Sequence, residues 1–369
     1  MILNWSKIKA GKQREITVDA KYKYMKGCFL LLTLSLGHLT GLAQVNIDSL
    51  CILGICTPTG YAIPGIDGMP RPKGVKYYQE RTPTYQIKST FKTIDSTISN
   101  DIQRTSSWWV KLRAPIILKD HFKLLVGLQY YQQELYFKDP DALNNAFHQS
   151  LEDKAIRSAG VSFNAFKSYI GNKYLVGRVT LRLNGDFDNG DLRHHLKSSY
   201  SVLYGIKKSV RKTWGFGASY SNSFGRSSIY PILFLNNKFK KKWAFRALLP
   251  VSTQLIYMPN DKNTLYFTNK LEGDNYNLNF ESLQPNRLYL EKADFKSFFT
   301  YEREIYDFIW FGVSTGMQFN INYDLSDSDL YFNRVSNATS DHTVIANELT
   351  PTPFLRIGLF LVPPRGWGD

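Results

Sequence analysis

The chain has 369 residues, of which 43% are hydrophobic and 15% aromatic, and its formal net charge is +15. A mean hydropathy of −0.29 excludes a membrane protein built of many apolar helices, but not a β-barrel, whose polar lumen and loops dilute its lipid-facing residues. The basic residues are scattered along the chain rather than gathered in one patch, so we expect no nucleic-acid partner.

The first 44 residues are expected to precede the mature protein. Residues 25–44, MKGCFLLLTLSLGHLTGLAQ, have a basic start, an apolar run and a small-residue end, which is typical of a signal peptide. The apolar run is too short to span a bilayer as a helix. Residues 1–24 indicate either a misassigned start codon, with Met25 as the first residue, or an extended basic region. Removing residues 1–44 leaves 39 basic and 29 acidic residues, a net charge of +10.

Residues 45–72 are predicted to form a periplasmic segment. The Pro and Gly residues of TPTGYAIPGIDGMPRPKG argue against regular structure as the chain enters the next region. Cys51 and Cys56 could form a disulfide in an oxidising compartment. Neither has the partner pair of a zinc site, and no Cys motif for a lipid anchor follows the apolar run. We therefore expect no metal and no cofactor.

From residue 73 to residue 369 the chain alternates apolar and polar residues. A period of two places alternate side chains on opposite faces of a β-strand. The clearest segments are SWWVKLRAPIIL (107–118), HFKLLVGLQYYQQ (121–133), KYLVGRVTLRLNG (173–185), KTWGFGASYSN (212–222), KWAFRALLPVSTQLIYM (242–258), DFIWFGVSTGMQFNINY (307–323) and PFLRIGLFLV (353–362). The pattern predicts an all-β domain over residues 73–369.

The apolar face of residues 242–258 indicates which solvent the strands meet. Its alternation runs for 17 residues with aromatic residues near both ends, which favours a lipid slab over the core of a secreted sandwich or lipocalin-like barrel. A bilayer admits a sheet only if the sheet closes, so we predict a single closed antiparallel transmembrane β-barrel. The residues expected to face lipid are Trp243, Phe245, Leu249, Val251, Leu255 and Tyr257.

Connection lengths predict the orientation and number of the strands. Short and long connections alternate, as in outer-membrane barrels with short periplasmic turns and long outer loops. The number depends on Pro250, because Pro removes a ladder donor and favours a strand end, whereas the alternation continues across it. We expect about 12 strands, with residues 242–258 as one crossing and NTLYFTNKLEG in an outer excursion; the alternatives are 10 or 14.

Basic residues recur on the face opposite the apolar stripe. If they line a wet lumen, they raise the local concentration of anions; if they pair with acids and tyrosines, they fill a narrow interior. The candidates for lumen-facing basic residues are Lys111, Arg113, Lys123, Arg178, Arg182, Arg246, Lys292, Lys296 and Arg356.

Chemistry-bearing residues outside this set give weaker signals. His194 and His195 in a predicted loop and Ser221 near a strand end do not have the order of a known lipase set, and we expect that the chain is not an enzyme. Asp186, Asp188 and Asp191 look like calcium ligands, but the closing Glu of that loop signature is missing.

The segment Pro231–Phe267, with Leu248, Leu249 and Pro250 at its centre, resembles uncharacterised outer-membrane β-barrel families of Bacteroidota. The resemblance covers about residues 70–363. It implies a barrel in a Gram-negative outer membrane, with membrane lipid and the barrel assembly machinery as partners, and names no substrate, catalytic residue or protein ligand. The chain departs from many such barrels because it does not end on an aromatic residue.

Three functions are compatible with these observations. The first is a small passive, porin-like channel with a basic lumen that favours anionic solutes. The second is a non-conducting envelope scaffold or a protein that binds partners through its surface loops. The third, which we expect least, is a lipid-modifying outer-membrane enzyme.

Overall fold

The computed structural model describes residue 62 and residues 65–92, 95–138, 146–152, 154–188, 192–280, 287–328 and 342–363. The predicted start codon, the signal peptide, Cys51 and Cys56 lie outside the described residues. No helix in the described part of the chain is long and apolar enough to cross a membrane.

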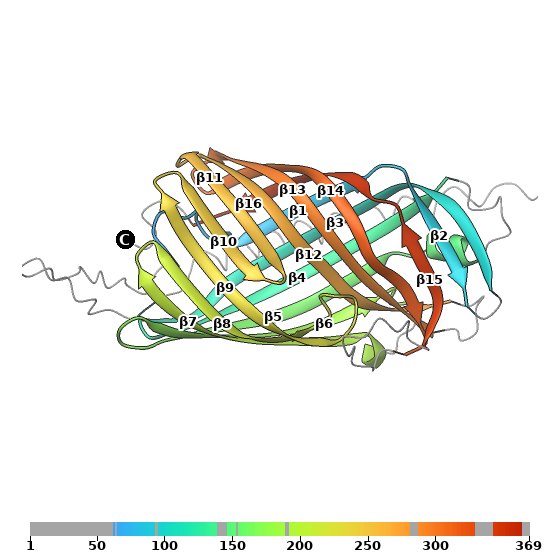
Figure 1. Ribbon diagram of the computed structural model, residues 1–369, viewed down its shortest axis with the longest axis horizontal. Coiled ribbons are helices and arrows are strands. Elements are labelled where there is room, and N and C mark those ends of the chain that lie inside the picture. The colour runs from blue at the N-terminus through green and yellow to red at the C-terminus, as the bar shows by residue number, and fades with distance from the viewer. Residues whose placement is uncertain are drawn as a thin grey trace, which may run out of the picture. The chain divides into compact units, whose positions relative to one another are not determined.

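The alternating segments form β-strands, which make up one large sheet (Figure 1). The first half of the sheet contains β1 (Val75–Thr82), β2 (Tyr85–Phe91), β3 (Ser96–Lys119), β4 (Phe122–Phe137), β5 (Ile156–Ser168), β6 (Lys173–Gly185), β7 (Leu196–Ser209) and β8 (Lys212–Ser221). The second half contains β9 (Ser228–Lys240), β10 (Trp243–Leu249), β11 (Ser252–Asn260), β12 (Asn263–Asn279), β13 (Arg287–Tyr306), β14 (Ile309–Ser326), β15 (Thr343–Leu349) and β16 (Thr352–Leu361). Two short helices, α2 (Ala146–Glu152) and the 3-10 turn η1 (Leu192–His195), lie in long connections.

The sheet closes on itself with fourteen strand positions. β1 and β2 both pair with β3, so they form one position that is interrupted around Pro83. β16 and β15 likewise both pair with β14 and form one position interrupted around Pro351. The first and last positions pair with each other through β1–β16 and β2–β15. Proline has no amide hydrogen for the ladder, which explains why both positions break there. The prediction of a closed antiparallel barrel is confirmed.

The prediction of twelve strands is wrong, and the alternative of fourteen is correct. Residues 242–258 are not one crossing but the hairpin β10–β11, with Pro250 in its turn, and NTLYFTNKLEG is part of the crossing β12. Trp243 pairs with Tyr257 and Phe245 with Leu255, so odd residues face odd residues across the hairpin. The apolar stripe therefore stays on one face through the turn, and alternation cannot distinguish a long strand from this hairpin.

The barrel changes circumference along its length. Beyond the ends of strands β7 to β11, Gly185 of β6 meets Asn277 of β12, and the Asp186 amide donates to the Asn277 carbonyl at 3.3 Å. We call the part with all fourteen positions the wide section. The narrow section is the ring of nine strands that remains, β2, β3, β4, β5, β6, β12, β13, β14 and β15.

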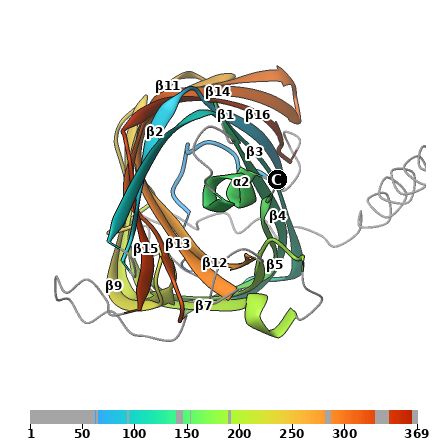
Figure 2. The same cartoon turned by 90° about the vertical axis from the view of Figure 1, so that its right-hand side faces the viewer.

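The narrow section is filled by a hydrophobic core, and helix α2 lies inside its ring (Figure 2). A barrel of about eight strands is just wide enough for side chains to fill, so nine positions leave no lumen there. Phe147 and Leu151 of α2 contribute to this core. Its other buried members are Tyr85, Ile87, Ile102, Leu135, Phe137, Ile156, Tyr276, Leu278, Phe280, Leu288, Leu290, Tyr323, Leu325 and Ile345.

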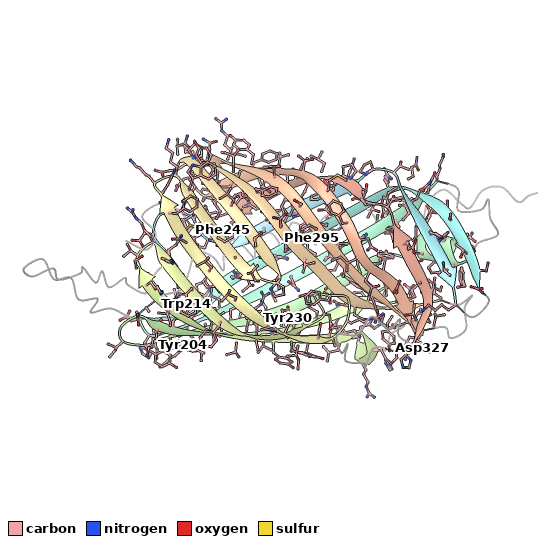
Figure 3. The ribbon with its side chains drawn as sticks, in the orientation of Figure 1. Tyr204, Trp214, Tyr230, Phe245, Phe295 and Asp327 are labelled. Atoms are coloured by element: carbon pink, nitrogen blue, oxygen red, sulfur yellow. The ribbon has the colours of Figure 1, made fainter. Side chains whose placement is uncertain are left out.

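The wide section has the opposite polarity, with large apolar side chains projecting from its outer wall (Figure 3). Exposed examples on its strands are Ile116, Leu118, Leu128, Phe163, Val179, Val202, Phe216, Leu233, Leu249, Leu255, Leu265, Phe299, Phe311, Met317, Leu355, Ile357 and Leu359. Soluble proteins rarely expose apolar surface of this extent without a partner that covers it.

Candidate functional site

The wide section encloses a cavity of about 1180 Å³. Fourteen positions make a barrel wider than its own side chains can fill, which is why the lumen stays open here and not in the narrow section. Twelve basic and five acidic side chains line this chamber, together with serines, threonines and tyrosines. The lining therefore carries an excess of positive charge.

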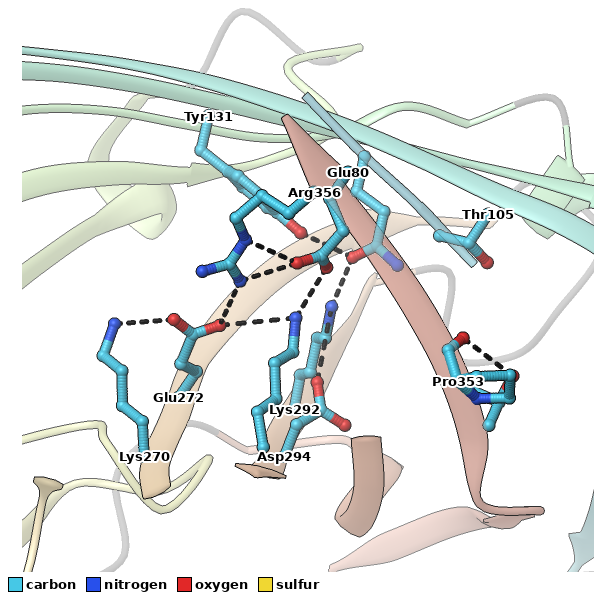
Figure 4. Close-up of polar contacts among 12 residues, drawn as sticks. Glu80, Thr105, Tyr131, Lys270, Glu272, Lys292, Asp294, Pro353 and Arg356 are labelled. Atoms are coloured by element: carbon cyan, nitrogen blue, oxygen red, sulfur yellow. Dashed lines mark hydrogen bonds and ion pairs between the residues drawn. The ribbon is translucent and has the colours of Figure 1, made fainter. Parts of the chain in front are cut away.

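An ion-pair network crosses the end of the chamber next to the narrow section (Figure 4). Glu80 on β1 accepts hydrogen bonds from Lys296 Nζ at 2.6 Å and from Arg356 Nη2 at 2.6 Å. Glu272 on β12 contacts Lys270 at 2.6 Å and Lys296 at 3.4 Å. These groups are buried except for Lys270 and Glu272, and each acid serves more than one cation. The network pairs each of these charged side chains and joins β1 and β16 to β12 and β13.

Five other cations of the chamber lack such partners. Lys76, Lys111, Arg113, Arg178 and Arg246 line the cavity, and none of them forms an ion pair within the described ranges. Lys111, Arg113 and Arg178 are exposed to the lumen. An exposed cation requires a polar environment, and the mutual repulsion of cations in one cavity is lowered by any anion that enters.

The mouth at the short-turn end is partly covered by residues 65–74. The Asp67 amide donates to Val210 O at 2.9 Å, on the turn between β7 and β8. Arg71 donates to Asp307 O at 2.6 Å, on the turn between β13 and β14, and to Pro363 O at 2.7 Å. The segment therefore spans from one side of the rim to the other and lines the chamber from within.

The structure places most of the predicted lumen-facing residues in the chamber. Lys123 on β4 is the exception, because it is not among the residues that line the cavity. Those that do are Lys111, Arg113, Arg178, Arg182, Arg246, Lys292, Lys296 and Arg356. Four of them pair with acids: Arg182 with Asp274 at 2.6 Å, Lys292 with Asp294 at 3.7 Å, and Lys296 and Arg356 with Glu80 at 2.6 Å. The predicted residues thus divide into cations that pair with acids and cations that form no ion pair within the described ranges.

Five of the six residues expected to face lipid lie on the outer face of the β10–β11 hairpin. Trp243, Leu249 and Leu255 are exposed, and the Trp243 ring packs on Tyr257 at 4.6 Å between centroids. Phe245 pairs with Leu255 on the same face. Val251 differs, because it lies in the turn after Pro250 and lines the cavity.

Sequence reasoning missed Lys76, Glu80, Lys270 and Glu272. The first two alternate with Tyr77 in VKYYQER, a pattern too short to stand out, and the last two fell in the segment assigned to an outer excursion. The signal that could have found them was the alternation within β12, where Lys270, Glu272 and Asp274 share one face.

The Ser and His residues considered for catalysis belong to separate networks. Ser221 Oγ lies 2.8 Å from Ser223 Oγ and 2.9 Å from Tyr230 OH. His195 is buried, with Nδ1 3.1 Å from the carbonyl of Asn184.

Two of the Asp residues considered for calcium contact a lysine, and the third, Asp191, lies outside the described residues. Lys154 Nζ is 3.1 Å from Asp186 and 2.6 Å from Asp188. No cluster of three or more His, Cys, Asp or Glu side chains suited to a metal occurs among the described residues.

Residues 142–361 match a family described as a domain of unknown function, DUF6268, and the chain belongs to this family. No curated protein matches the sequence. Among solved structures, a FadL homologue from Pseudomonas aeruginosa is 9% identical, with 82% of this chain and 99% of that one covered and a TM-score of 0.39. The Pseudomonas putida toluene transporter TodX is 8% identical, with 82% and 95% covered and a TM-score of 0.26. The outer membrane protease OmpT from Escherichia coli is 8% identical, with 80% and 99% covered and a TM-score of 0.25.

Proposed function

We propose that this protein is an integral outer-membrane β-barrel that admits small anionic solutes into its chamber and that is closed to through-flow in the conformation described. In this proposal the short turns face the periplasm and the narrow section projects outward. The Bacteroidota origin, the assembly machinery as a partner and the absence of enzymatic activity stay predictions.

The outer wall supports the membrane location. A tilted strand needs roughly 9 to 11 residues to cross a bilayer. The short strands β8, β10 and β11 have 10, 7 and 9 residues, close to this length, whereas β3 has 24 and β13 has 20. The exposed apolar residues lie on the part of the wall that the short strands share with the long ones. Heat-modifiable migration of the membrane-extracted protein tests for a closed barrel in the envelope; its absence would contradict the proposal.

The unpaired cations carry the proposal of anion entry. Ser201 lines the chamber and pairs with Arg178 across β6 and β7, so Ser201→Cys places a thiol beside them. With Cys28, Cys51 and Cys56 replaced by Ser, we expect an anionic methanethiosulfonate reagent to react about tenfold faster than a cationic one, since charged clefts raise counter-ion concentration by at least this factor. Gln86→Cys, exposed on β2, is the control and should show little preference.

Replacing Lys111, Arg113 and Arg178 by Gln should remove the preference. None of the three pairs with an acid in the described chain, so the substitutions leave no buried carboxylate without a partner. If the anionic reagent still reacts about tenfold faster than the cationic one in the triple variant, these cations do not attract anions into the chamber.

The filled narrow section supports closure. We expect the refolded protein to show no steady open-channel current in planar bilayers. A non-conducting scaffold is the second candidate, and the same hydrophobic core favours it. The labelling experiment distinguishes the two candidates. A scaffold that admits no solute requires no difference between the anionic and the cationic reagent at the Ser201→Cys position. Steady ohmic current in the unmodified protein would contradict closure.

A further inference from the structure

The short turns of the barrel carry an unusual concentration of positive charge. At least one exposed cation lies at each of the six turns β3–β4, β5–β6, β7–β8, β9–β10, β11–β12 and β13–β14. We call these residues the basic collar: Lys119, Lys167, Lys173, Lys208, Arg211, Lys212, Lys240, Lys241, Lys242, Lys262 and Arg303. None forms an ion pair within the described ranges, and the exposed acids at these turns are Asp120 and Asp261.

The opposite end of the described barrel is nearly balanced. Its exposed cations are Arg81, Lys88, Lys92, Arg104, Lys138 and Arg193, and its exposed acids are Asp95, Asp188, Asp327 and Glu348. Some of these charges pair, as Lys88 does with Glu348 at 4.0 Å. The basic excess is therefore a property of the short-turn end and does not follow from the net charge of the whole chain.

Apolar side chains are interleaved with the collar. Ile170 is 83% exposed in the β5–β6 turn, Val210 is 58% exposed in the β7–β8 turn, and Ile305 is 64% exposed beside the β13–β14 turn. Phe239 stands between the lysines of the β9–β10 turn and is half exposed. A water-soluble polyanion needs the cations only, whereas the boundary between lipid headgroups and acyl chains accepts both kinds of side chain.

We propose that the basic collar binds the headgroups of anionic glycerophospholipids in the leaflet next to the short turns, with the apolar tips inserted below the phosphates. This inference rests on the proposed membrane location. Each cation near an anionic membrane surface contributes about 1 kcal/mol, which is about a fivefold preference per charge. The collar would thereby fix the depth of the barrel and recruit anionic lipid to its rim.

Lipid selectivity can be measured by electron paramagnetic resonance on the full chain, refolded into phosphatidylcholine vesicles with spin-labelled phosphatidylglycerol or phosphatidylcholine. We expect the motionally restricted fraction to show about a fivefold preference for phosphatidylglycerol, reduced in 1 M salt. Replacing Lys240, Lys241 and Lys242 by Gln should lower it at least twofold. The matched control replaces Lys88, Lys92 and Lys138 by Gln and should leave the preference unchanged.

Three outcomes would overturn the inference. The first is that both spin-labelled lipids are motionally restricted to the same extent, and the second is that the collar and control variants lose the phosphatidylglycerol preference equally. The third is tight binding of heparin in detergent without any phosphatidylglycerol preference, which would indicate a soluble polyanion instead. Heat-modifiable migration of each sample shows independently whether the barrel has inserted. A barrel that inserts without lipid preference contradicts the collar alone, whereas failure to insert contradicts the proposed function.

Discussion

The wide and narrow sections share seven strands, β3 to β6 and β12 to β14, yet they are opposite in polarity. On β13, Lys296 faces the chamber of the wide section, whereas Leu288 and Leu290 face the core of the narrow section. On the outside, Phe299 is exposed in the wide section, whereas Lys88 and Glu348 are exposed in the narrow one. The number of strand positions explains the difference, because the interior of a nine-strand ring is filled by its side chains, whereas a fourteen-strand ring leaves an open lumen.

Register shifts help the polarity to change along one strand. Ile321 and Tyr323 of β14 are both odd-numbered, yet Ile321 is exposed and Tyr323 is buried in the core. The pairing with β13 shifts between Ala293 and Asp294, which leaves Ile321 as an extra residue on β14. A bulge of this kind re-aims the side chains that follow it. The pairing of β3 with β4 shifts similarly between Ile102 and Arg104.

The largest effect is expected from Glu80→Ala, at the boundary between the two sections. It leaves Lys296 and Arg356 buried without their main partner, and breaking a buried ion pair from one side costs about 3–5 kcal/mol. The urea concentration at which heat-modifiable migration is lost should fall accordingly. The side chain of Glu348 is 81% exposed, so Glu348→Ala should change this urea concentration little. Equal shifts in both variants would show that the network does not stabilise the barrel.

A smaller effect is expected from Gly185→Val, which acts on the contact that creates the narrow section. A Cβ atom at Gly185 would lie 2.3 Å from Asn277 O and 2.2 Å from His195 Nδ1, so β6 and β12 must separate. Overpacking of this kind costs about 1–3 kcal/mol. Amide exchange over residues 276–280 and 287–290 should accelerate by about tenfold or more, while the wide section keeps its protection.

Gly177→Val is the matched control on the same strand, because a Cβ atom there meets nothing within 4 Å. Both substitutions replace glycine by a β-branched residue in β6, so a difference between them reports the β6–β12 contact. If the control accelerates exchange in the narrow section as much, strand propensity rather than this contact holds the ring closed.

The third effect is a pH dependence confined to the narrow section. His148 of α2 is fully buried, and burial lowers its pKa to about 4. Its Nε2 lies 3.0 Å from Ser89 Oγ, which donates to Asn347, so Nε2 must carry the hydrogen. Above about pH 6.5 the His148 side chain is neutral whether α2 is docked or released. As the pH falls from 6.5 towards 4, His148 takes up a proton only when α2 is released. The free energy that favours docking of α2 therefore falls by at most about 3 kcal/mol.

Amide exchange of residues 147–151 at pH 7 and 4.5, corrected for intrinsic rates, measures this loss. We expect protection to fall by up to about fiftyfold at the lower pH. His148→Gln keeps a donor for Ser89 but does not titrate, so its protection should not depend on pH in this range. The same pH dependence in the Gln variant would assign the effect to other groups.

The sequence by itself determined the all-β class and, in most strands, the face on which a side chain lies. These properties are local, since a period of two is visible in residues such as Lys111 and Arg113 without knowledge of what they pair with. Only the tertiary structure decided the number of strands, the closure of β6 on β12, and which cations Glu80 and Glu272 neutralise. Those depend on which strands meet around the ring, and the stripe from Trp243 to Tyr257 reads the same in one strand or in two.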